Sequence, residues 1–122
     1  MPTYKGDFRR GYQFAWGLQG AALVGATTGT GVLMPLGDGL SSAIILLGTV
    51  GVGTIQIEES DVLGSGYTAV PDGLYTYATT EDNTVVALTY QRSKKYLRVV
   101  VTPTGASDVA VAFIETKKTY VG

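Results

Sequence analysis

The sequence predicts an all-β fold: an antiparallel β-sandwich or jelly-roll-like single domain with an extended N-terminal arm. Short runs of β-branched and aromatic residues recur along the chain, and glycine-rich or turn-prone segments separate them. No stretch combines a 3.6-residue periodicity with good helix formers and a cap. The chain holds 17 glycines yet is 45% hydrophobic, which fits many tight turns better than disorder.

Residues 1–10 are expected to form an exposed N-terminal arm, and residues 11–122 a single β domain. The arm is polar and includes Arg9 and Arg10. It lacks the long apolar core and small-residue cleavage site that mark a signal peptide. A chain of 122 residues is large enough for one hydrophobic core and too short for two.

Short apolar runs in the first half are expected to form strands. Within Tyr12–Leu18, the side chains of Phe14, Trp16 and Leu18 share one side. Gly53–Glu58 alternates isoleucine with polar residues, which predicts a half-buried strand. Further strands are expected at Ala22–Val24, Val32–Leu36 and Ala43–Leu47, although Asp38–Leu47 also fits one short helix.

Two stretches contain no charged residue and are nominally long enough for a transmembrane segment: Gly11–Gly37 and Gly39–Ile57. Glutamine, hydroxyl residues and glycines interrupt both stretches, and the most apolar segment, Ala43–Leu47, is short. A spanning helix needs about 20 predominantly apolar residues. Membrane insertion is therefore not expected.

Two turns are predicted in the middle of the chain. Val70–Gly73 reads Val-Pro-Asp-Gly, which places proline and glycine where a tight turn needs a fixed negative φ and a permitted positive φ. Glu81–Asn83 is expected to join the strands Leu74–Thr80 and Val85–Tyr90 as a hairpin. Gly64–Gly66 is expected to be a flexible loop.

The C-terminal third carries the strongest strand signal, in the runs Val85–Tyr90, Tyr96–Thr102 and Val109–Thr116. The connections between them have hairpin lengths, so the simplest prediction is a three-stranded antiparallel meander. Such a sheet needs a second layer, which the rest of the chain supplies. The expected core comprises Leu97, Val99, Val101, Val86, Leu88, Val109, Val111 and Phe113.

Charge is sparse and segregated along the chain. Charged residues make up 16% of the sequence, against about 25% in typical domains, and the net charge is −1. Basic residues occur only before Gly11 and after Gln91, with acidic residues between them. Copies of the chain can therefore pair head to tail, or the two sets can neighbour each other within one fold. The apolar, weakly charged composition predicts an assembly that covers part of the surface, with neither nucleic acid nor a membrane as partner.

No catalytic, cofactor-binding or metal-binding residue is predicted. Cysteine and histidine are absent, which removes thiolate chemistry, sulfur-ligated zinc and the usual catalytic triad. Glu58, Glu59 and Asp61 form the densest acidic cluster. They can bind a hard cation, or they can mark a solvated strand end that discourages edge pairing. A general acid–base pair drawn from these three residues and Asp72 is conceivable, but nothing in the sequence fixes the separation of the carboxyl groups.

A basic cluster is predicted to contact a partner. It comprises Arg92, Lys94, Lys95 and Arg98 at one strand connection. Such a cluster gains most when it meets carboxylates on a protein partner. Contact with a nucleic-acid backbone, with neighbouring tyrosines stacking on bases, is the alternative.

An aromatic cluster is the second predicted interface. Tyr12, Phe14 and Trp16 follow Arg9 and Arg10, a composition typical of interface anchors, and core packing is the alternative. A different open possibility is a carbohydrate-binding surface built on an exposed aromatic ring. Its candidates are Tyr67, Tyr75 and Tyr77.

Two segments resemble small virion structural proteins of tailed bacteriophages. Lys94–Gly105 reads KKYLRVVVTPTG and is similar to a C-terminal strand of that group. Gly53–Asp61, GTIQIEESD, followed by Gly64–Tyr67, is similar to that group's strand, Glu-Ser-Asp and aromatic segment. The similarity extends over about Gly53 to Thr116.

The resemblance implies a non-enzymatic capsid decoration or cement protein, made in the bacterial cytoplasm and built into the virion. Its partners would be the major capsid protein and copies of itself, in a trimer or another symmetric oligomer. A head-to-tail connector, a tail component and a small carbohydrate-binding β module remain as alternatives.

Overall fold

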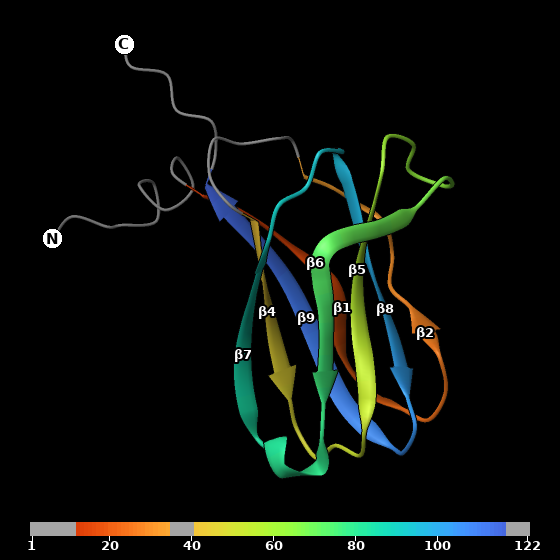
Figure 1. The fold of residues 1–122 in the computed structure, drawn as a ribbon, viewed down its shortest axis with the longest axis vertical. Coiled ribbons are helices and arrows are strands. Elements are labelled where there is room, and N and C mark those ends of the chain that lie inside the picture. The colour runs from red at the N-terminus through yellow and green to blue at the C-terminus, as the bar shows by residue number, and fades with distance from the viewer. Residues whose placement is uncertain (1–11, 35–40, 117–122) are drawn as a thin grey trace, which may run out of the picture.

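The computed structural model describes residues 12–34 and 41–116, which form two antiparallel sheets packed face to face (Figure 1). Sheet A has the strand order β1 (Tyr12–Leu23), β9 (Ser107–Thr116), β4 (Ser41–Leu47) and β7 (Thr84–Tyr90). Sheet B has the order β2 (Thr27–Thr28), β8 (Tyr96–Pro103), β5 (Gly53–Ser60) and β6 (Thr68–Tyr77), and β3 (Val32–Leu33) also pairs with β8. The predicted all-β sandwich is confirmed.

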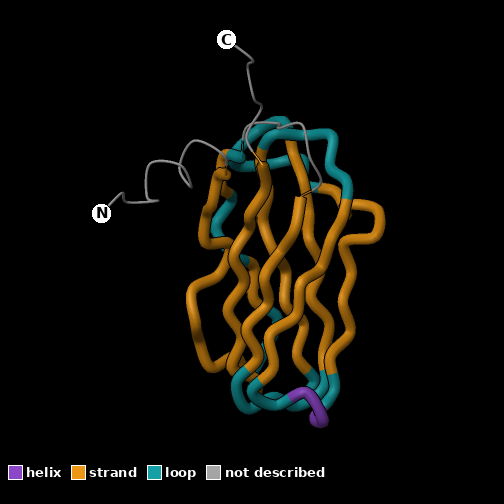
Figure 2. The backbone as a smooth tube through the Cα atoms, turned by 90° about the vertical axis from the view of Figure 1, so that its left-hand side faces the viewer, coloured by secondary structure: helices purple, strands orange, loops and turns teal. Residues whose placement is uncertain are grey.

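The strands run along the length of the sandwich, and one short 3₁₀ helix, η1 (Thr79–Glu81), lies at its end (Figure 2). The predicted arm, residues 1–10, lies outside the described residues. Within the described part of the chain, no helix is long and apolar enough to cross a membrane.

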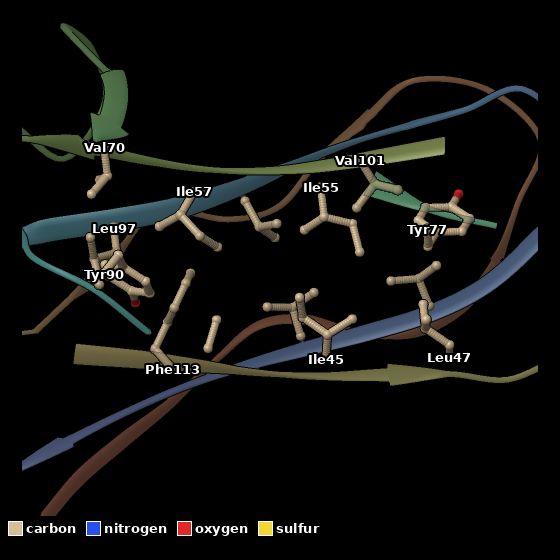
Figure 3. Close-up of a cluster of buried hydrophobic side chains, with 14 of the residues drawn as sticks. Ile45, Leu47, Ile55, Ile57, Val70, Tyr77, Tyr90, Leu97, Val101 and Phe113 are labelled. Atoms are coloured by element: carbon tan, nitrogen blue, oxygen red, sulfur yellow. The ribbon is translucent and has the colours of Figure 1, made fainter. Parts of the chain in front are cut away.

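The core lies between the two sheets and follows the period-two alternation of each strand. Ile55, Ile57 and Val101 of sheet B face Ile45 and Phe113 of sheet A (Figure 3). Of the predicted core residues, Val86 and Leu88 are partly buried and pack against the cluster. The others are buried, namely Leu97, Val99, Val101, Val109, Val111 and Phe113.

The predicted C-terminal meander is wrong. β7 and β9 belong to sheet A, whereas β8, which lies between them in sequence, belongs to sheet B. β7 pairs with β4, β8 pairs with β5, and β9 lies between β1 and β4. Each connection therefore crosses from one sheet to the other. A strand with one apolar side shows the same alternation whether its successor lies beside it or across the core.

Both predicted turns in the middle of the chain are also wrong as chain reversals. Val70–Gly73 lies within β6, where the register jumps from Glu58↔Ala69 to Gln56↔Leu74. Asp72 has a φ of 63°, so the turn-forming residues make a bulge rather than a hairpin. The hairpin predicted at Glu81–Asn83 is instead η1 and a crossing from sheet B to sheet A.

The first-half predictions have mixed outcomes. Gly53–Glu58 is confirmed as part of β5, and residues 41–47 form a strand rather than the alternative helix. β1 is one strand of 12 residues that includes Ala22 and Leu23, with two register shifts, where two separate strands were expected. The first shift, between Trp16 and Leu18, includes Gly17, which lies against the ring of Phe113, and the second lies between Leu18 and Ala21.

Candidate functional site

Arg92, predicted to contact a partner, forms an ion pair inside the fold. Its guanidinium meets the Glu115 carboxylate, with Nε 2.8 Å from Oε2, and both side chains are only 2% exposed. Nη1 of Arg92 also donates to the carbonyl oxygen of Lys94 at 2.8 Å. This pair fixes the connection between β7 and β8 to the end of β9.

Two more side chains complete this group, which we call the polar end cluster: Gln13, Ser41, Arg92 and Glu115. Nε2 of Gln13 donates to Oε1 of Glu115 at 2.6 Å, and the Ser41 hydroxyl donates to the other carboxylate oxygen. The buried carboxylate thereby receives donors from β1, β4 and the β7–β8 connection. Charge-assisted hydrogen bonds of this kind are the strong ones.

The acidic cluster does not form one solvated strand end, so that prediction is wrong for Glu59. Because β5 continues to Ser60, successive side chains of the cluster point to opposite faces. Glu59 is buried and accepts the backbone N–H groups of Ser93 and Lys94 at 2.8 and 3.1 Å. Asp61 is exposed. Among residues 12–34 and 41–116, no group of three or more acidic side chains is placed to hold a metal ion.

Arg98 pairs with the acidic middle of the same chain. Its Nε lies 2.6 Å from Oε1 of Glu58, and its guanidinium lies over the ring of Tyr67, 4.2 Å from the centroid. Burial raises the pKa of the Tyr67 hydroxyl, and the charge of Arg98 partly offsets that rise. For this pair, the acidic and basic segments neighbour each other within one fold.

Of the remaining basic candidates, the structure describes Lys94 and Lys95, in the connection between β7 and β8. Lys95 places Nζ 5.6 Å from the centroid of the Tyr96 ring, and Lys94 is half-buried. Arg9 and Arg10 lie outside the described residues. Tyr12 begins β1. The predicted role of these residues at a partner interface remains a prediction.

The tyrosines proposed for carbohydrate binding have different environments. Tyr77 is fully buried, and its hydroxyl donates to Oγ of Ser107 at 2.9 Å. Tyr75 is half-buried and donates to the Glu81 carboxylate, which raises its pKa. Tyr67 is half-buried beneath Arg98. Tyr77 therefore cannot serve as an exposed platform.

The outer face of sheet A is the most unusual surface of the described structure. Phe14 and Trp16 project from β1 and stack edge to face, with ring centroids 5.5 Å apart. Phe14 is 49% exposed, Trp16 41% and Val85, on the opposite edge strand, 63%. We call this surface the apolar face; its residues are Phe14, Trp16, Ser42, Ile44, Leu46, Val85, Ala87, Thr89, Ala110, Ala112 and Ile114.

None of these residues is charged, but the exposed Asp108, the next outward residue of β9 beyond Ala110, lies at the edge of the face. Ser42 and Thr89, the two polar residues of the face, have their hydroxyl oxygens 3.3 Å apart. The outer face of sheet B differs. There Thr54, Gln56 and Glu58 alternate outward along β5, and Arg98 of β8 pairs with Glu58. One sheet thus has an ordinary polar outer face, and the other does not.

Sequence reasoning identified Phe14 and Trp16 but missed the rest of this surface. The available signal was the composition of β9, where Val109–Ile114 is apolar on both sides of the strand. An antiparallel strand with one solvated side normally alternates with polar residues. On β9 that alternation is absent, and Ala110 and Ala112 on its outer side are already buried within the chain.

Comparisons with known proteins assign no family. No protein-family model matches the chain, and no curated protein matches it. A crystal structure of PirA is similar with a TM-score of 0.45 and 16% identity, covering 86% of this chain and 92% of that one. CsCBM6-3 from Clostridium stercorarium, solved in complex with cellobiose, is similar with a TM-score of 0.43 and 19% identity, covering 87% and 82%. These likenesses assign no function.

Proposed function

We propose that this chain is a non-catalytic structural protein that binds other protein subunits through the apolar face. The observation that carries the proposal is a largely apolar sheet face, on which Phe14, Trp16 and Val85 remain exposed and a charged residue, Asp108, lies only at the edge. Contiguous apolar patches of this kind mark interaction surfaces, whereas scattered apolar side chains need no explanation. Aromatic side chains are also the commonest hot spots of protein interfaces.

The arrangement of charge supports the same proposal. Arg92, Glu115 and Glu59 are buried and satisfied within the fold, and Arg98 pairs with Glu58. These groups stabilise the sandwich and its connections. The uncharged surface is therefore the stronger candidate for contact with a partner.

The more specific proposal is a capsid decoration or cement protein of a tailed bacteriophage, supported by the resemblance of Lys94–Gly105 and Gly53–Tyr67 to that group. Each copy would bury its apolar face against coat subunits or sister copies. Because the chain would bind only the assembled form, it would stabilise the particle by mass action. A connector or tail component would use the same face at a lower copy number.

A lysine in the middle of β7, an edge strand of the face, tests the proposal. Ala87→Lys places a charge on an exposed position of the apolar face, and Thr102→Lys is the matched control on the outer face of sheet B. Co-sedimentation with the virion that contains the protein should show wild-type and Thr102→Lys occupancy alike. Ala87→Lys should lose at least about tenfold in apparent affinity, because a charge would be desolvated without a partner. Equal binding of both lysine variants would refute the proposal.

A carbohydrate-binding function is the second candidate, favoured by a hollow of about 370 Å³ beside Trp16 that Gln19, Thr28 and Thr30 also line. An aromatic ring next to hydroxyl and amide groups suits a sugar, which has both apolar faces and hydroxyls. Calorimetric titration against a panel of oligosaccharides tests it. Saturable binding that Trp16→Ala abolishes would support it, and a flat titration would remove it.

A further inference from the structure

We infer that the occupant of the apolar face is the same face of a second copy, related by a two-fold axis that runs parallel to the strands between β9 and β4. This inference rests on the proposed function and names its partner. A two-fold interface requires a surface complementary to itself. Under this axis, β1 of one copy lies opposite β7 of its partner, and β9 lies opposite the partner's β4.

Residues in register across the four strands form rows on the face, and the side-chain sizes in the middle row meet this requirement. Trp16, Ala112, Ile44 and Ala87 occupy one register across β1, β9, β4 and β7, so the order is large, small, large, small. The axis reverses that order in the partner. Each large side chain then faces a small one, with Trp16 over Ala87 and Ile44 over Ala112.

In the next row, which contains Gly20, the axis also places large side chains opposite small ones. Gly20 lies beside Ala110, and Leu46 and Val85 continue the row across β4 and β7. A shallow hollow of about 400 Å³ is lined mainly by apolar residues, among them Gly20, Ala110 and Leu46, with Asp108 at its border. Reversal brings Val85, the most exposed large apolar residue of the face, over Gly20 and its hollow. A projection thus meets a depression.

The third row also reverses into complementarity. Phe14, Ile114, Ser42 and Thr89 share one register, with the two large side chains on one half of the row and the two small ones on the other. Reversal places Phe14 over Thr89 and Ile114 over Ser42. All three rows therefore pair large with small side chains under one axis.

The alternative two-fold axis, perpendicular to the strands, fails this test. It would place Trp16 over Trp16 and Ala112 over Ala112 in the middle row, with a collision on one strand and a gap on the next. Under the proposed axis, parallel to the strands, the two sheets would cross at about 30°, as aligned sheets do. That crossing shifts the edge strands by only about 4 Å along their length. Because successive rows of side chains are about 7 Å apart along a strand, each row still faces the same row of the partner.

The size of the face sets the expected strength. Four strands about 4.8 Å apart and seven residues at about 3.4 Å each cover roughly 450 Å² per copy. Two copies would bury roughly 900 Å² or more, near the lower limit of about 1,000 Å² for specific complexes. The dimer should therefore form at concentrations on the order of 10 to 100 µM. It should not weaken with added salt, because the apolar face has no basic side chain to pair with Asp108 across the axis.

A size swap tests the axis, with the dimer dissociation constant measured by sedimentation equilibrium. Trp16→Ala leaves a gap and Ala87→Trp opposes two tryptophans, so each single variant should raise the dissociation constant at least about 30-fold, as for an interface hot spot. The double variant Trp16→Ala/Ala87→Trp should return to within a few-fold of wild type. Trp16→Ala/Val85→Trp is the control and should not recover, because Val85 lies in another row. Far-ultraviolet circular dichroism confirms that each variant is folded.

The outcomes separate the two proposals. A double variant that dimerises as weakly as either single variant would overturn the axis. A wild-type chain that stays monomeric at several hundred micromolar, while Ala87→Lys still abolishes binding to the particle, would overturn the second copy as occupant and leave the proposed function standing. Dimerisation that the size swap restores, with no effect of Ala87→Lys on particle binding, would refute the proposed function alone.

Discussion

Neutralising Glu115 should destabilise the fold far more than neutralising Glu58, although each carboxylate pairs with one arginine. Glu115 and Arg92 are each 2% exposed, whereas the side chains of Arg98 and Glu58 are 31% and 20% exposed. Glu115→Gln removes the charged partner of a buried ion pair, a change that costs about 3–5 kcal/mol. Glu58→Gln removes a partly solvated pair, which costs about 0–1 kcal/mol.

Urea unfolding followed by far-ultraviolet circular dichroism measures both free energies. The double variant Arg92→Met/Glu115→Met should recover most of the loss, because it leaves neither charge buried. Its remaining deficit would report the loss of the hydrogen bonds that Gln13 and Ser41 donate to the Glu115 carboxylate. If Glu115→Gln unfolds within 1 kcal/mol of wild type, the polar end cluster does not stabilise the fold as argued.

Two further substitutions probe the packing. Gly17→Ala should destabilise the fold by about 1–3 kcal/mol, because the added Cβ would lie 2.5 Å from the buried Phe113 ring. The control Gly64→Ala, with open space around the added Cβ, should have an unfolding free energy within about 0.5 kcal/mol of wild type. Equal effects of the two substitutions in thermal unfolding would contradict this prediction. Tyr90→Phe should be neutral or stabilising at pH 7, because the Tyr90 hydroxyl is buried without a hydrogen-bond partner in the described structure. Burial also raises the pKa of Tyr90 above its unfolded value of about 10, so the folded state retains this proton as pH rises and stability falls above about pH 10. Tyr90→Phe should reduce that alkaline loss, and an unchanged slope of unfolding free energy between pH 9 and 11 would count against the assignment.

The inward side of each strand could be predicted from the sequence because the alternation of side chains is local. Leu97, Val99 and Val101 face the core on β8, and the intervening residues face outward, as the period-two pattern predicts. The same holds for Ile55 and Ile57 on β5. These predictions needed no knowledge of the neighbouring strand.

The pairing of the strands could not be predicted in the same way, because it depends on contacts far apart in the chain. β9 pairs with β1 and β4, and nothing near Val109–Thr116 identifies either partner. The bulge in β6 escaped prediction because proline, aspartate and glycine fit a chain reversal equally well. A local pattern fixes a strand's orientation toward the core but not its sheet.

In the candidate site, too, features local to one strand could be predicted from the sequence, whereas contacts between distant segments could not. The sequence predicted that Arg92 contacts a partner, because its acceptor in the fold, Glu115, lies 23 positions away. Glu59 fitted a solvated strand end because the residue that donates to it, Ser93, lies 34 positions away. The apolar face becomes visible only when β1, β9, β4 and β7 are placed side by side. Phe14 and Trp16 could be identified from the sequence because they lie two positions apart on one side of the same strand.

The single tryptophan of the chain, Trp16, reports directly on the central claim that the apolar face is covered by protein in the functional state. Acrylamide quenching of its fluorescence compares the dilute protein, in which Trp16 is 41% exposed, with the assembled protein. The account predicts a blue-shifted emission and a several-fold lower quenching constant on assembly, and Ala87→Lys should prevent both changes. A Trp16 that is quenched equally in the dilute and assembled states would contradict it.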